Sequence, residues 1–275
     1  MKKKCPVCQT AKHLITKYRY REGVVSVCKR CDLAIFLGPM PKSAGADIAE
    51  EGVVFQYLKR LVLRYEFNHL KKYQKLRLLE IGSGSGELAK MLSRQGHRVE
   101  CNDVDLASLK RISRKFKLKT LYGPIDTLKI KDKTYDGVVF RHVFEHIDNP
   151  EVLVATIHRI LKNNGKLFIT QPNYNSLCRR IIGKNWTGFS VPNHRYSWSL
   201  SNFKLFLEVN GFKVIKTRTF FSHFGLPLNL SQFVKNKYLN TALNPLFLVV
   251  GSVFELFFVL VGRGQNLFIE AEKYE

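Results

Sequence analysis

Acidic residues are scarce in this chain of 275 residues. It has 22 aspartates and glutamates against 45 lysines and arginines, which gives a formal net charge of +23 at pH 7. This imbalance excludes an acidic surface and attracts anionic partners, whether nucleic acid, phosphorylated small molecules or an acidic membrane leaflet. The charge does not select among them, and a basic solvated surface without a specific partner also explains it.

Long apolar runs are also missing. No N-terminal segment combines a basic start, an apolar stretch and a small-residue cleavage site, so we expect the chain to start at Met1 in the cytosol. The most apolar stretch, Leu246 to Val261, has 16 residues, fewer than the ~20 that cross a bilayer. Hydrophobic residues still make up 45% of the chain, which predicts a globular protein and excludes a disordered one.

Cysteine is sparse outside two short motifs. Four of the six cysteines form CPVC and CKRC, separated by nineteen residues, and the other two stand alone. This spacing is typical of a structural zinc site, in which four thiolates surround Zn²⁺ and leave no open position for catalysis. The predicted ligands are Cys5, Cys8, Cys28 and Cys31. Two redox pairs or an iron–sulfur cluster are the alternatives.

The segment between the two cysteine pairs predicts a zinc ribbon over residues 1–40. β-Branched and aromatic residues flank Glu22 and Gly23, a pattern that favours a hairpin. So short a segment cannot bury a core of its own, and metal binding would supply its folding energy.

Strand and helix patterns alternate along the remaining chain. After a linker and a helix within residues 41–75, a larger domain is expected over 76–275. Such alternation predicts an α/β fold with a doubly wound, mostly parallel sheet. The expected strands are Arg77–Ile81, Arg98–Asn102, Lys119–Tyr122, Tyr135–Phe140, Lys166–Thr170, Phe212–Phe220 and a last one near 265–272; the expected helices are Phe55–Tyr73, Glu87–Gln95, Leu106–Phe116, Pro150–Leu161 and Leu200–Asn210.

The stretch LLEIGSGSGELAKML, from Leu78 to Leu92, points to a ligand site. Gly82, Gly84 and Gly86 let the chain turn tightly and approach a ligand without Cβ atoms in between. In doubly wound sheets ligands bind beyond the carboxyl ends of the strands, which is where this loop falls. Read from Gly84, GSGELA also fits the dinucleotide pattern G-x-G-x-x-A, so the glycines alone leave a nicotinamide enzyme open.

Four segments in order carry a resemblance to a known family. LLEIGSGSG, VECNDVD, YDGVVFRHVFEHIDNP and LKNNGKLFITQPN together resemble the S-adenosylmethionine-dependent methyltransferases of the Rossmann-like class, closely over Arg77 to Gln171 and more loosely to Lys273. The resemblance implies a seven-stranded sheet and S-adenosylmethionine as cofactor.

The resemblance also implies which residues hold the cofactor. Asp103 would accept hydrogen bonds from both ribose hydroxyls; the alternative is a helix cap, a role that Asp105 fills as well. The family often has an acid directly after the glycine that ends the third strand, whereas this chain has Pro124 there. The full predicted set is Glu80, Gly82, Gly84, Gly86, Asp103, Ile125, Asp126 and Arg141.

Candidate catalytic residues follow the fourth strand and the fifth. They are His142, Glu145, His146 and His194. A base is needed only if the attacking atom must lose a proton, because the methyl donor is already activated. The alternatives are structural: Glu145 and His146 hold their loop together, and His194 binds a backbone carbonyl.

The passage WTGFSVPNHRYSWSL is similar to one in many members of this group and implies an acceptor pocket. The predicted lining is Asn173, Tyr174, Trp186 and Tyr196.

The tail contains an apolar helical segment over residues 243–262, inserted before the last strand. Asn244, Gly251, Glu255 and Gly262 would share one stripe, and the other faces are apolar. It is interpreted as a buried or dimer-forming helix, or as a helix at a membrane interface that shelters a lipid substrate. A membrane span is disfavoured, because a sheet strand must follow it.

We therefore expect a methyltransferase that acts on an anionic small molecule, a sugar or a lipid-linked acceptor, in the cytosol or on the inner membrane face. Enzymes with a similar ribbon suggest cell-surface glycan synthesis by analogy. The runner-up is an RNA methyltransferase that grips phosphates, and a third hypothesis is a non-catalytic module that kept the cofactor fold.

Overall fold

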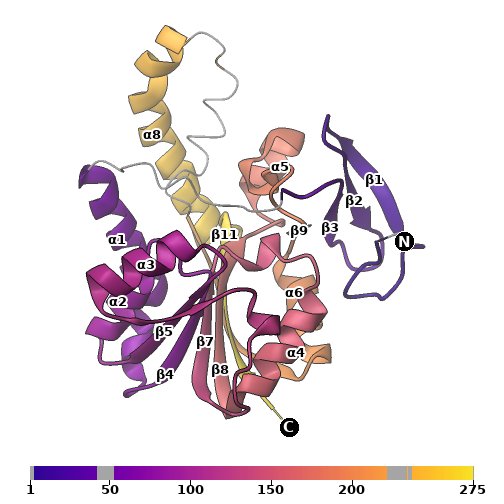
Figure 1. The fold of residues 1–275 in the computed structure, drawn as a ribbon. Helices are drawn as coiled ribbons and strands as arrows, with labels where there is room; N and C mark the ends of the chain where they lie inside the picture. The colour runs from indigo at the N-terminus through magenta and orange to yellow at the C-terminus, as the bar shows by residue number, and fades with distance from the viewer. Residues whose placement is uncertain (1–2, 42–52, 222–233, 235–236, 275) are drawn as a thin grey trace.

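The computed structural model describes residues 3–41, 53–221, 234 and 237–274. Within these ranges the strands form two sheets, a large one in the centre of the molecule and a small one near the N-terminus (Figure 1).

The large sheet has seven strands in the order β10-β11-β8-β7-β4-β5-β6. Strand β11 is antiparallel to both of its neighbours, and the other neighbouring pairs are parallel. The predicted seven-stranded, mostly parallel sheet is thus confirmed. Its strands are β4 (Arg77–Ile81), β5 (Arg98–Asp103), β6 (Lys119–Tyr122), β7 (Tyr135–Arg141), β8 (Leu161–Pro172), β10 (Phe212–Phe220) and β11 (Asn266–Lys273).

Helices cover both faces of this sheet. Because side chains alternate along a strand, Leu79 packs into the core cluster under α4 and α6, while Leu78 packs into the cluster under α1, α2 and α3. The main helices are α1 (Val53–Phe67), α2 (Glu87–Arg94), α3 (Leu106–Phe116), α4 (Pro150–Ile160), α5 (Leu177–Ile182), α6 (Leu200–Val209) and α8 (Lys237–Leu260). Short 3₁₀ turns are η1 (Asn68–Lys72), η2 (Ile125–Thr127), η3 (Phe144–His146), η4 (Gly183–Asn185) and η5 (Thr187–Phe189).

Two helices near the ligand edge begin at capping residues. The Asp105 carboxylate accepts hydrogen bonds from the backbone N–H groups of Ala107 and Ser108 at the start of α3. Ser199 and Asn202 form a capping box at the start of α6. Asp105 therefore fills the cap, and the Asp103 side chain points elsewhere.

The small sheet joins the N-terminal segment to the larger domain. Its order is β1 (Leu14–Arg19), β2 (Val24–Cys28), β3 (Ala34–Leu37) and β9 (Tyr196–Ser197), all antiparallel. The expected hairpin is present, and β9 adds a strand that comes from far along the chain. Arg195, next to β9, donates hydrogen bonds to the backbone oxygens of Phe36 and Gly38.

Helix α8 extends away from the body of the molecule (Figure 1). Gly251, Glu255 and Phe258 are buried at its inner end. From Leu246 onward, the exposed apolar side chains among the described residues of the helix and its end are Leu246, Val249, Val250, Val253, Phe254, Leu256, Phe257, Leu260 and Val261. In the part of the chain that the structure describes, no helix is both long and apolar enough to cross a membrane.

Candidate active site

The glycine loop lies between the ends of two parallel strands. It follows β4 and is tied to β5, since the N–H groups of Gly82 and Ser83 both donate to the Asn102 carbonyl, at 2.8 and 3.0 Å. All three glycines have positive φ, between 49° and 72°. A Cβ on Gly82 would lie 2.3 Å from Val143 Cγ2, whereas one on Gly84 would meet nothing within 4 Å. The loop is therefore packed on its inner side and open above Gly84.

Asp103 ends β5 and faces this loop. Its Oδ2 accepts a hydrogen bond from the Gly84 N–H at 2.8 Å, and its Oδ1 accepts one from the Asp105 N–H at 2.9 Å. A carboxylate oxygen has a second lone pair, so each oxygen can still accept a hydroxyl donor. The glycine loop and Asp103 are thus side by side, as the sequence predicts.

Glu80 is buried at the end of β4. Burial raises its pKa to about 8, although the backbone N–H of Ala89 and the charge of Arg141 oppose the shift. Its Oε2 has no hydrogen-bond partner among the described residues. An unpaired buried oxygen beneath an open glycine loop fits a site that a ligand completes.

The other predicted cofactor residues differ in exposure. Ile125 is buried in the core, and Asp126 beside it is exposed. The Arg141 guanidinium pairs with Glu66 of α1, with Nε and Oε2 2.7 Å apart. Sequence patterns gave no sign of this pair, because Glu66 lies on a helix 75 residues earlier.

A carboxylate and three histidines gather beyond β7. Glu145 is 2% exposed, and His142 Nδ1 lies 3.4 Å from its Oε1. Burial opposes ionisation of Glu145, but the neighbouring imidazoles, His142 first, outweigh it and lower its pKa to about 2. His146 and His194 meet edge to face, with ring centroids 4.6 Å apart. The four predicted catalytic residues are therefore brought together.

Backbone contacts fix the segments that carry this cluster. His146 Nδ1 lies 2.9 Å from the Asn193 carbonyl, and His194 Nδ1 lies 2.8 Å from the Gly188 carbonyl. Burial lowers the pKa of His194 to about 4. His194 thus makes the backbone contact that was its structural alternative, and its other ring nitrogen stays available.

The predicted acceptor residues are buried and take part in internal contacts. Asn173 donates to the Gly264 carbonyl, Trp186 Nε1 donates to Gln265, and the Tyr196 hydroxyl donates to the Asp148 carbonyl. Tyr174 is fully buried under Arg179. Their role in acceptor binding remains a prediction.

The sequence placed Gln171 at the ligand edge of the sheet but assigned it no role. It is 1% exposed near the end of β8, and neither atom of its amide group has a partner among the described residues. Its neighbour Thr170 accepts a hydrogen bond from the His142 N–H, which places Gln171 beside the cluster. A polar residue that ends an otherwise apolar strand was the available signal.

The four ribbon cysteines also lie together. The sulfurs of Cys5 and Cys31 are 3.5 Å apart, those of Cys8 and Cys28 are 3.8 Å apart, and all four lie within 4.8 Å of one another. Four sulfurs at ~2.3 Å in a tetrahedron around zinc lie about 3.8 Å apart, so this arrangement fits the metal.

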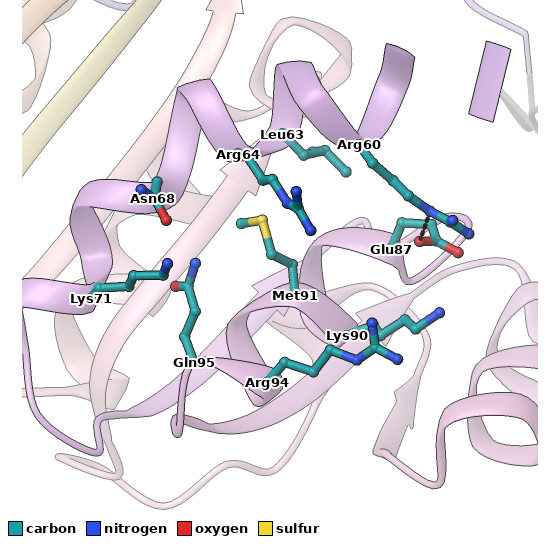
Figure 2. A pocket seen from close by; sticks show the side chains of 10 residues that line it. All are labelled: Arg60, Leu63, Arg64, Asn68, Lys71, Glu87, Lys90, Met91, Arg94 and Gln95. Atoms are coloured by element: carbon teal, nitrogen blue, oxygen red, sulfur yellow. Dashed lines mark hydrogen bonds and ion pairs between the residues drawn. The ribbon is translucent and has the colours of Figure 1, made fainter. Parts of the chain in front are cut away.

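A basic groove lies between α1, η1 and α2, and Figure 2 shows its lining. Glu87 is paired with Arg60 at 3.3 Å. The basic side chains are Arg60, Arg64, Lys71, Lys90 and Arg94. The groove concentrates positive charge on one face of the molecule.

Comparison with known proteins agrees with this geometry. Residues 51–217 match the family model of the methyltransferase domain. The chain belongs to this methyltransferase family. A solved S-adenosylmethionine-dependent methyltransferase shares its fold. This match does not support the nicotinamide alternative. A non-catalytic module that kept the fold would match the same family model.

Two relatives and one structure illustrate the similarity of the methyltransferase. It is 28% identical over 166 residues to the ubiquinone biosynthesis O-methyltransferase of Rickettsia conorii, covering 58% of this chain and 53% of that protein. It is 34% identical over 113 residues to an uncharacterized protein of Methanocaldococcus jannaschii, covering 41% and 45%. The structure of a SAM-dependent methyltransferase from Archaeoglobus fulgidus superposes with a TM-score of 0.56 at 23% identity, covering 79% of this chain and 94% of that one. The chain spans about half the length of the curated relatives it matches.

Proposed function

We propose that this methyltransferase acts on a hydroxyl oxygen of a small amphiphilic acceptor at a membrane surface. The observation that carries the proposal is the buried Glu145 with three histidines around it, beyond the strand next to the glycine loop. A hydroxyl must lose its proton as its oxygen attacks, and an imidazole oriented by a carboxylate is suited to take that proton. The O-methyltransferase relatives agree with an oxygen acceptor.

The proposed cofactor site consists of the glycine loop and Asp103, with Glu80 beneath and Ile125 and Asp126 at the adenine end. S-adenosylmethionine, when bound, supplies a methyl group already activated on a positively charged sulfur. Asp103 would hold the ribose hydroxyls through the lone pairs that Gly84 and Asp105 leave unused. The open space above Gly84 would admit the ligand.

His142 is the proposed general base. Its Nδ1 faces Glu145 Oε1 at 3.4 Å, which orients the ring and leaves Nε2 to receive the proton. The side chain is 30% exposed, so an acceptor can reach it. Alignment of the reactants can contribute ~7–11 kcal/mol, which leaves a modest task for the base.

Helix α8 supports an amphiphilic acceptor. The exposed apolar side chains between Leu246 and Val261 form one broad face, about half of the helix circumference, opposite the side that holds Gly251, Glu255 and Phe258. A broad apolar face on one side is what a helix lying at a membrane interface presents to the acyl chains. The net charge of +23 favours an anionic leaflet.

The four cysteines are proposed to hold a structural zinc ion, in a ribbon domain of residues 1–40. Sulfur fills all four positions, so this metal would take no part in the reaction. Its proposed role is to fold the ribbon, which β9 connects to the segment carrying His194.

The acceptor class can be tested with purified enzyme, S-adenosylmethionine labelled on the methyl group, and a cell extract separated into lipid, RNA and soluble fractions. We expect base-stable label in the lipid fraction, as an ether. Label in RNA would contradict a small amphiphilic acceptor. Label in a soluble sugar would contradict an acceptor at a membrane surface. His142→Ala should lower transfer at least a hundredfold and leave cofactor affinity within twofold.

A further inference from the structure

We propose that Glu145, His146 and His194 bind a divalent transition-metal ion, at a site separate from the ribbon cysteines. One potential ligand atom from each residue lies within 4.8 Å of the other two. The role of the metal in the reaction rests on the proposed function. The metal site itself is argued from geometry alone.

The two histidines are already oriented as metal ligands require. A backbone carbonyl can only accept a hydrogen bond, so Nδ1 of His146 must carry its proton toward Asn193, and Nδ1 of His194 toward Gly188. Each Nε2 is then deprotonated and has a free lone pair. Metal-binding histidines are typically held in this way by a backbone carbonyl on the other nitrogen.

Glu145 supplies the negative charge. It is 2% exposed, and apart from His142 Nδ1, 3.4 Å from Oε1, neither carboxylate oxygen faces a donor among the residues that the structure describes. A buried carboxylate without donors is costly unless a cation lies next to it. His142 at 3.4 Å satisfies one oxygen in part, which leaves the other for a metal.

The ligands come from two segments that the backbone holds together. Glu145 and His146 lie in η3, and His194 lies in the loop before β9. The Arg195 N–H donates to the Glu145 carbonyl at 2.8 Å, which connects the two segments next to the ligands. The site is therefore preorganised.

The ligand set indicates which metal would bind. Two imidazoles and one carboxylate leave coordination positions open and suit Mn²⁺, Fe²⁺, Co²⁺ or Zn²⁺, whereas four thiolates select a softer ion. An open position would take the acceptor oxygen and lower the pKa of its hydroxyl. The released proton would pass to His142, which is outside the proposed ligand set.

The test uses full-length protein that holds one zinc ion per chain, enough for the four ribbon cysteines alone, titrated with MnCl₂ and followed by electron paramagnetic resonance of free Mn²⁺. We expect one Mn²⁺ per chain, at least tenfold weaker binding in Glu145→Gln and in His194→Ala, and unchanged binding in His158→Ala, a histidine far along α4. S-adenosylmethionine affinity within twofold of wild type in each variant shows that the fold is retained.

Wild-type protein that binds the cofactor but neither Mn²⁺ nor Co²⁺ would overturn the metal site and leave the proposed function standing. Equal loss of Mn²⁺ binding in His158→Ala would also overturn it. Mn²⁺ binding without label transfer to any acceptor would support the metal site and count against the proposed function instead.

Discussion

Two neighbouring aspartates have different roles at the residue scale. Asp105 caps α3, whereas Asp103 faces the glycine loop with a lone pair to spare on each oxygen. Asp103→Ala should weaken S-adenosylmethionine binding at least tenfold, because hydrogen bonds to a charged group contribute ~1.5–3 kcal/mol each. Asp105→Ala should leave that affinity unchanged and lower the free energy of unfolding by ~1 kcal/mol. Calorimetric titration and urea unfolding measure the two effects; equal affinities in both variants would contradict the assignment.

Glu80 makes stability depend on pH. Burial raises its pKa from the ordinary 4.5 to about 8, so the folded state binds more protons than the unfolded state between these values. Its contribution to stability is complete below pH 4.5 and is lost as pH rises through about 8. Glu80→Gln stays neutral, so the unfolding free energy of wild type should fall relative to this variant by up to ~1.4 kcal/mol per pH unit. Urea unfolding of wild type and Glu80→Gln without cofactor, at four pH values from 5 to about 8, measures this difference. The same pH dependence of the unfolding free energy in both proteins would refute the prediction.

At the scale of elements, the ribbon connects a metal site to a catalytic loop. Strand β3 pairs with β9, which begins two residues after His194. Cys28→Ser should remove the zinc, and amide hydrogen exchange should become faster in residues 192–198, because ribbon folding depends on metal binding. Cys178→Ser, which alters a buried thiol outside the ribbon, should retain the zinc. Unchanged zinc content or unchanged exchange in Cys28→Ser would contradict this coupling.

Helix α8 gives a second prediction at this scale. The double variant Val253→Gln and Phe257→Gln should bind phosphatidylglycerol vesicles at least tenfold more weakly, because burying each large apolar side chain contributes ~1.5–3 kcal/mol. The charge does not change. Val209→Gln in α6 removes a similarly exposed apolar side chain and should bind like wild type. Equal cosedimentation of wild type, the double variant and Val209→Gln with the vesicles would contradict membrane binding through α8.

For the whole molecule, sequence predicted the central sheet well because its signals are local. The bounds of β4, β6 and β10 are those expected. The helix expected over Phe55–Tyr73 instead ends as α1 at Phe67 and continues as the 3₁₀ turn η1. Contacts between distant segments were not predictable, because they leave no periodic pattern. They include the addition of β9 to the ribbon sheet and the Glu66–Arg141 pair.

In the candidate site too, features with a local sequence signal were predictable, and contacts between distant segments were not. The glycine loop and Asp103 follow from one motif and the ends of two adjacent strands. The sequence named His142, Glu145, His146 and His194 as candidates, but only the fold places His194 against His146. The free lone pairs on two histidines next to an unpaired carboxylate follow from backbone carbonyl positions, which no sequence pattern encodes.

The central claim is that the loop after β4 and the carboxylate that ends β5 together hold the methyl donor. Calorimetric titration of zinc-replete wild-type protein with S-adenosylmethionine, and separately with NAD, tests it most directly. We expect one S-adenosylmethionine per chain with a dissociation constant at micromolar level, and no binding of NAD. Absence of heat at millimolar S-adenosylmethionine, or equal affinity for NAD, would contradict it.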